Sequence, residues 1–190
     1  MQYPKVLRNT VISGITLLLL FLLFKVSNDP DAPRTIDNIS STRSTLLFIS
    51  AFILPGLLFG MAVAAGTPRL ENKQVNKLFY VILCGLLYVG LFIPSIRSAT
   101  HVLVFSGLGA FGVTVLYHLL INKLNSLPIY ALIAAVGGML AALPMFLFFD
   151  SPEMEEGLKD KMPFLPLLIF PIWHILVGGI IAKGAKLLQS

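Results

Sequence analysis

Residues 163–182 read PFLPLLIFPIWHILVGGIIA, an apolar run with one ionisable side chain, His174, near its middle. A helix rises about 1.5 Å per residue, so about 20 apolar residues cross a hydrocarbon core about 30 Å thick. The run therefore predicts a last membrane span that carries one polar group deep inside the bilayer.

The composition of the whole chain indicates the same class of protein. Of 190 residues, 56% are apolar and 12% are charged, whereas charged residues make up about a quarter of soluble domains. The single cysteine, Cys84, offers neither a disulfide framework nor a paired-cysteine zinc site. We expect a membrane protein with no metal site and no cofactor.

Five further apolar runs precede the last one. The first follows Lys5 and Arg8 and is not followed by a small-residue cleavage pattern, so we predict a retained span and not a signal peptide. We expect an all-α membrane protein: one domain, 1–190, forming a compact bundle of six transmembrane helices. The expected spans are 6–26, 45–65, 75–94, 99–121, 127–149 and 163–182.

An even number of spans places both termini on one side of the membrane. With both termini cytoplasmic, the inner loops and ends hold eight of the 14 Lys and Arg residues and the outer loops hold six, a bias in the sense of the positive-inside rule. We therefore expect a plasma membrane protein, of the bacterial inner-membrane type, with acidic loops 27–44 and 150–162 outside. The basic residues lie in short loops between apolar runs, so the expected partner is the lipid bilayer and not nucleic acid.

Small residues recur within the spans at helical spacing. In a bilayer such residues let helix backbones approach closely. The fourth span even contains a literal G-x-G-x-x-G, but a dinucleotide site needs that motif after a strand and at the start of a helix. We interpret these residues as helix-packing positions, within the bundle or against a membrane partner or second copy of the chain: Gly56, Gly60, Ala64, Gly107, Gly109, Gly112 and Gly138.

Prolines and one aromatic residue lie close to His174 in sequence or interrupt other spans. Pro55, Pro144 and Pro171 each remove a backbone donor, and broken helices line substrate sites in many transporters. These prolines, with Trp173 and His174, are the candidate ligand or pathway residues. The simpler interpretation is that a neutral His174 donates to a backbone carbonyl freed by Pro171, with Trp173 packed beside it.

The three histidines lie at different expected depths. At about 1.5 Å per residue, His101 is at the outer surface, His118 at the inner surface, and His174 about 16 Å inside. A bis-histidine haem would need two histidines at one depth on facing helices. These three histidines lie at different depths, so the sequence does not favour haem. No acidic residue lies as deep as His174, which argues against a carboxylate proton relay.

A serine in the fourth span offers a catalytic alternative. Ser106 precedes a glycine-rich stretch, and His174 lies in the sixth span, four residues before Gly178. This layout is similar to that of rhomboid intramembrane proteases, although Val104 stands where the family's G-x-S-G motif begins with glycine. The resemblance implies a Ser106/His174 dyad in which the imidazole activates the hydroxyl.

Two function classes thus follow from the sequence. The first is a small transporter, channel-like protein or membrane subunit of a larger complex, without catalysis. The second is an intramembrane serine hydrolase that uses Ser106 and His174.

Overall fold

The computed structural model describes residues 3–27, 40–67, 74–95, 98–122, 124, 126–150 and 168–186. Within these ranges the chain forms six helices and no strand. The expected all-helical, six-helix chain is therefore confirmed for the described residues. Most of both expected acidic outer loops, and residues 163–167 at the start of the expected last span, lie outside them.

The helices overlap each expected span. They differ from the expected ranges mainly at their ends. The last helix continues four residues beyond 182, and the second begins five residues before 45. The helices are α1 (Tyr3–Ser27), α2 (Ser40–Gly66), α3 (Gln74–Ser95), α4 (Ala99–Leu120), α5 (Leu127–Asp150) and α7 (Ile169–Lys186).

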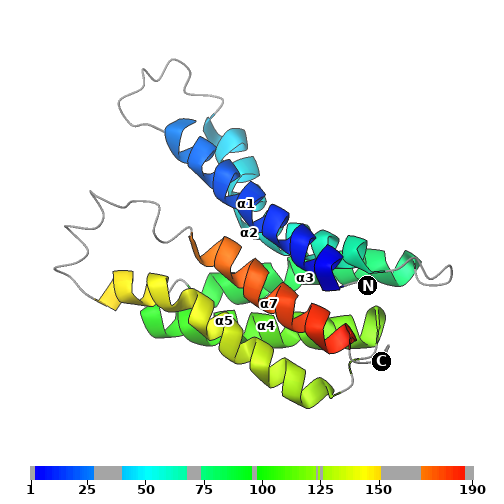
Figure 1. The fold of residues 1–190 in the computed structure, drawn as a ribbon. Coiled ribbons are helices and arrows are strands. Elements are labelled where there is room, and N and C mark those ends of the chain that lie inside the picture. The colour runs from blue at the N-terminus through cyan, green and yellow to red at the C-terminus, as the bar shows by residue number, and fades with distance from the viewer. Residues whose placement is uncertain are drawn as a thin grey trace.

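The helices form a ring in which each packs mainly against its chain neighbours. Helix α7 closes the ring by packing against both α5 and α1, and it makes lesser contacts with α2 and α4. Adjacent helices run in opposite directions: Gly56 of α2 lies against Cys84 of α3, whereas Gly60, one turn later in α2, lies against Val81, earlier in α3. The N- and C-termini lie at the same end of the bundle (Figure 1).

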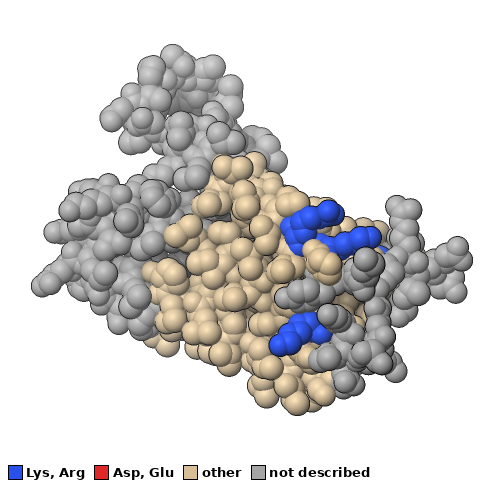
Figure 2. Space-filling model, viewed as in Figure 1, with Lys and Arg blue, Asp and Glu red and all other residues tan. Residues whose placement is uncertain are grey.

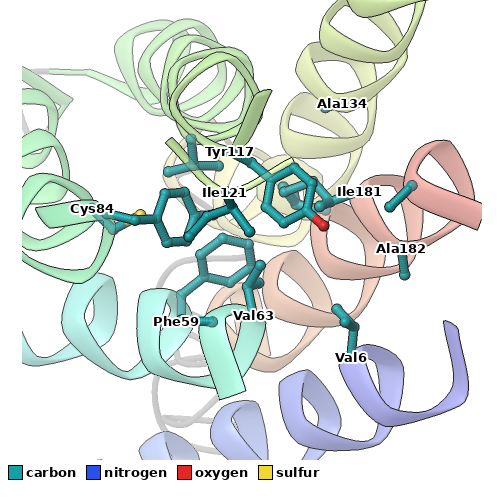
Figure 3. Packing of buried hydrophobic residues seen from close by; sticks show 14 of the residues in the cluster. Val6, Phe59, Val63, Cys84, Tyr117, Ile121, Ala134, Ile181 and Ala182 are labelled. Carbon is teal, nitrogen blue, oxygen red and sulfur yellow. The ribbon is translucent and has the colours of Figure 1, made fainter. Parts of the chain in front are cut away.

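A cluster of buried apolar residues lies between the helices (Figure 3). All six helices contribute to it, because every helix turns one apolar face inward. Its largest fully buried members are Tyr80, Tyr117, Phe59 and Ile181, from α3, α4, α2 and α7. Packing inside the ring therefore holds all six helices together.

By length and composition, only some of the described helices could each cross a membrane. Two helical stretches, Thr100–Leu120 and Leu127–Pro144, are long and apolar enough to cross a membrane by length and composition. Three other apolar helical stretches within the described residues are shorter: Ile53–Gly66, Val75–Leu91 and Ile169–Ala185.

Candidate functional site

His174 lies inside the bundle and joins α7 to two other helices. Its side chain is only 2% exposed, and its Nδ1 lies 2.9 Å from the Ser13 hydroxyl of α1. The backbone of Pro55, in α2, also forms a hydrogen bond with the ring. One imidazole therefore ties together α1, α2 and α7.

The partners of His174 fit a neutral ring. Proline has no backbone N–H, so the Pro55 group must be its carbonyl, which accepts from the ring. With Nδ1 facing Ser13, the remaining nitrogen, Nε2, is the donor to Pro55. Nδ1 then accepts the proton of the Ser13 hydroxyl, and both ring nitrogens are satisfied without a charge.

Aromatic side chains surround this polar contact. The Phe59 ring lies edge-on to His174 at 5.2 Å and edge-on to Trp173 at 4.9 Å between centroids. The Trp173 and His174 rings are 5.9 Å apart. Apolar rings exclude water, so the hydrogen bonds of His174 have no competing solvent partner.

Trp173 connects α7 by a hydrogen bond to α4, on the other side of the helix ring. Its indole Nε1–H donates to the backbone carbonyl of Ser106 in α4 at 3.2 Å. The Ser106 hydroxyl in turn donates to the carbonyl of Gly138 in α5 at 2.7 Å. Two consecutive residues of α7 thus bond to three other helices, and Ser106 extends the connection to a fourth, α5. We call this layer the polar tier; it consists of Ser13, Pro55, Ser106, Gly138, Trp173 and His174.

Ser106 and His174 both belong to the polar tier, but they do not form the expected hydrogen-bonded pair. The Ser106 hydroxyl points at the Gly138 carbonyl, and the His174 Nδ1 faces Ser13. The physical reason is the close approach of α4 and α5: a Cβ on Gly138 would lie 2.6 Å from the Ser106 carbonyl oxygen. That approach brings the Gly138 carbonyl within reach of the hydroxyl and gives it a partner.

Ser13 and His174 form a different serine–histidine pair, with Pro55 as the group that orients the base. This arrangement has the order of nucleophile, base and orienting group. Ser13, however, lies in the middle of α1 and is 7% exposed, and mid-helix N–H groups are already bonded within the helix. The pair therefore lacks free backbone donors for an oxyanion, and its geometry suits a clamp between helices.

The candidate prolines occupy three different settings. Pro55 lies in the middle of α2 and is buried, and Pro144 lies within α5 and is partly exposed. Pro171 is the third residue of α7, where an N–H has no partner within the helix. The expectation that Pro171 frees a carbonyl for His174 is thus wrong; the carbonyl is that of Pro55.

Comparison with protein-family models, curated proteins and solved structures finds no match for this chain. Across the described part of the chain, no group of three or more His, Cys, Asp and Glu residues is placed to hold a metal ion.

The other two histidines complete the ends of α4. Ser98 caps the N-terminus, where its hydroxyl accepts from the backbone N–H of His101 and lies 2.6 Å from the His101 Nδ1. At the other end, the His118 Nδ1 accepts from the backbone N–H of Leu124 at 2.8 Å. Both histidines therefore satisfy backbone or neighbouring groups at helix ends.

The candidate packing glycines contact several neighbouring helices. Gly56 and Gly60 lie against α3, Gly107 lies against α5, and Gly112 lies against Leu87 of α3. Gly109 is looser, since a Cβ there would be 3.6 Å from Leu91 and 3.8 Å from Trp173. Ala64 is buried in the core cluster. The G-x-G-x-x-G stretch is thus divided among different helix contacts.

Sequence reasoning missed the polar face of α1. Asn9 donates to the Ala62 carbonyl of α2 at 3.3 Å, and Thr10, fully buried, bonds carbonyls of its own helix. These two residues lie four and three positions before Ser13, so all three share one side of the helix. That spacing, inside an otherwise apolar run, is a signal that could have identified Ser13.

Tyr80 is a buried residue that the polar tier does not use. Its hydroxyl has no nitrogen or oxygen partner, alone among the fully buried side-chain N and O atoms described, and interacts only with the thiol of Cys84, a weak hydrogen-bonding group. A buried hydroxyl without a full partner costs about 1–3 kcal/mol. We predict that Tyr80→Phe leaves the fold unchanged and stabilises it by about 1 kcal/mol. Thermal unfolding in detergent measures this, with Ser13→Ala as a control that removes a satisfied hydroxyl; a lower unfolding midpoint for Tyr80→Phe contradicts it.

Proposed function

We propose that this chain is an integral protein of the plasma membrane, of the bacterial inner-membrane type, that crosses the bilayer six times and has no catalytic role. In this proposal it is a small transporter, a channel-like protein or, as the polar tier favours, the membrane subunit of a larger assembly. The observation that carries the membrane part is the outward surface of the bundle.

Large apolar side chains cover that outward surface. Only 33% of each of the two long apolar windows, in α4 and α5, is buried inside the bundle, whereas the core helix of a soluble protein is mostly buried. Large exposed apolar surfaces are rare on soluble proteins and mark contact with a membrane or a partner. Among the exposed residues are Leu19 (55%), Leu78 (62%), Leu86 (59%), Leu119 (68%), Leu132 (62%) and Leu140 (54%).

The charged residues support the proposed orientation. Lys5 and Arg8 lie near the start of α1 and Lys183 near the end of α7, at the end of the bundle that holds both termini (Figure 1), and Figure 2 shows basic side chains on the surface toward this end. In a bilayer, Lys and Arg near helix ends favour the cytoplasmic side. This supports a topology with both termini in the cytoplasm.

The polar tier supports a non-catalytic role. Its hydroxyls and its ring nitrogens all bond partners inside the bundle, and no Asp, Glu, Lys or Arg belongs to it. A proton relay through a membrane protein normally uses ionisable residues that face one another. A tier that joins five helices without a charge suits a rigid membrane subunit.

Alkaline extraction of membranes tests the membrane proposal. We expect the protein to stay with the membrane pellet at alkaline pH and to dissolve only in detergent, because the apolar surface needs lipid. Its release into the supernatant without detergent would contradict the proposal.

A serine-directed phosphonate probe tests the absence of catalysis. We expect no labelling above that of the Ser106→Ala and Ser13→Ala variants, because neither hydroxyl has both a free base and oxyanion donors. Labelling that is lost in one of these variants would establish the hydrolase instead and would name its nucleophile.

A further inference from the structure

One face of α1 combines cations and apolar residues in a single stripe. Lys5, Arg8, Ile12, Ile15 and Leu19 are separated by three or four residues, so they line one side of the helix. All five are exposed, the last three by 55%, 48% and 55%. The stripe begins with two positive charges and continues as aliphatic surface.

Helix α7 adds a third cation beside this stripe. The two helices are antiparallel neighbours, since Thr10 lies against Gly178 and Leu7 lies against Gly179. Continuing this register by one turn brings Lys183 level with Lys5. Figure 2 shows basic side chains in two patches toward this end.

The N-terminus of α1 adds to the positive potential around these three cations. Helix α1 has no acidic residue in its first turn. The positive end of a helix dipole also lies at the N-terminus of α1, where it disfavours cations and favours anions. Lys77, at the same end, already donates to the Thr67 carbonyl. The cluster therefore favours the binding of an anion.

We propose that this face binds an anionic phospholipid of the inner leaflet. The headgroup phosphate lies among Lys5, Arg8 and Lys183, and an acyl chain follows Ile12, Ile15 and Leu19. Arg8 can hold two phosphate oxygens at once through its planar guanidinium. The charge order along the stripe, cations at the end and aliphatic residues toward the middle, is that of a phospholipid from headgroup to tail. This inference rests on the proposed membrane insertion.

Lipid titration of the detergent-purified protein, followed by native mass spectrometry, tests the site. The probes are phosphatidylglycerol and phosphatidylcholine with the same acyl chains. We expect phosphatidylglycerol to bind more tightly, and the triple variant Lys5→Gln, Arg8→Gln, Lys183→Gln to lose about fivefold in that preference per cation removed. The variant Lys5→Arg, Lys183→Arg should keep the preference.

A control pair separates this site from general charge. Lys25→Gln with Arg43→Gln removes one cation near the C-terminus of α1 and one near the N-terminus of α2, away from the proposed site. We expect the lipid preference to remain in this variant. An equal loss in this control, or no loss in the triple variant, overturns the proposed site. Equal competition by inorganic phosphate would also overturn it, because the aliphatic part of the stripe would then contribute nothing.

Alkaline extraction of the same preparations distinguishes the two proposals. If the protein is released without detergent, the membrane proposal itself has failed. If it remains in the membrane and the triple variant keeps its preference for phosphatidylglycerol, only the lipid site has failed.

Discussion

Replacing His174 by alanine should destabilise the bundle by about 3 kcal/mol or more. The side chain is 2% exposed and fills the space between Phe59 and Trp173, and truncating a buried ring of this size leaves a cavity. The change also leaves the Ser13 hydroxyl without its inter-helix partner. Reversible unfolding in detergent micelles, measured for each variant against the parent, gives the loss in free energy.

Ser13→Ala separates the hydrogen bond from the packing. We expect it to cost about 1–2 kcal/mol, because it removes the partner of a buried ring nitrogen. The double variant should lose less than the sum of the two single losses, by about 1 kcal/mol, since both changes remove one shared contact. Thr16→Ala is the matched control: Thr16 is exposed and bonds only the Ile12 carbonyl of its own helix, so its effect should be within about 0.5 kcal/mol. If the losses in unfolding free energy from Ser13→Ala and His174→Ala are strictly additive, the proposed hydrogen bond between Ser13 and His174 is contradicted.

Replacing Gly56 by alanine should have the second large effect. A Cβ at this position would lie 2.5 Å from the Cys84 carbonyl oxygen, 2.7 Å from the Tyr88 Cβ and 2.9 Å from the Gly85 Cα. Two of these neighbours are backbone atoms, so α2 and α3 must separate to make room. We expect a loss of about 3 kcal/mol in unfolding free energy, at the upper end of overpacking effects.

Gly90→Ala is the control for this prediction. Gly90 is exposed on α3, and a Cβ there would meet nothing within 4 Å. Alanine is the better helix former, so this variant should be more stable than the parent by about 0.5–1 kcal/mol. If Gly56→Ala and Gly90→Ala shift the unfolding midpoint equally, the prediction that α2 and α3 pack too closely at Gly56 to admit a Cβ is wrong.

The helices could be predicted from the sequence because each is a long apolar run bounded by polar residues. The interior of the bundle could be predicted only in part. The burial of His174 was predicted from its place in the last run, but its partner was not, because Ser13 is 161 positions away in the chain. Contacts of that kind depend on which helices are neighbours in the closed ring, and no local pattern states that α7 packs against α1.

The hydrogen-bond partner of Ser106 also could not be predicted from the sequence. A serine and a histidine in two spans resembled a known dyad, and the spacing along the sequence allowed it. The packing of α4 on α5 through Gly138 decides otherwise, since it presents a backbone carbonyl to the hydroxyl. Small residues thus predicted where helices approach closely, and not which polar groups meet there.

Cysteine accessibility in intact cells tests the six-span membrane account most directly. The buried Cys84 is replaced by alanine, and single cysteines are introduced at Gln2, Asp31, Glu156 and Gln189. We expect a membrane-impermeant maleimide to label positions 31 and 156 in intact cells, and positions 2 and 189 only after the membrane is opened. Equal labelling of all four positions before and after opening would contradict the account.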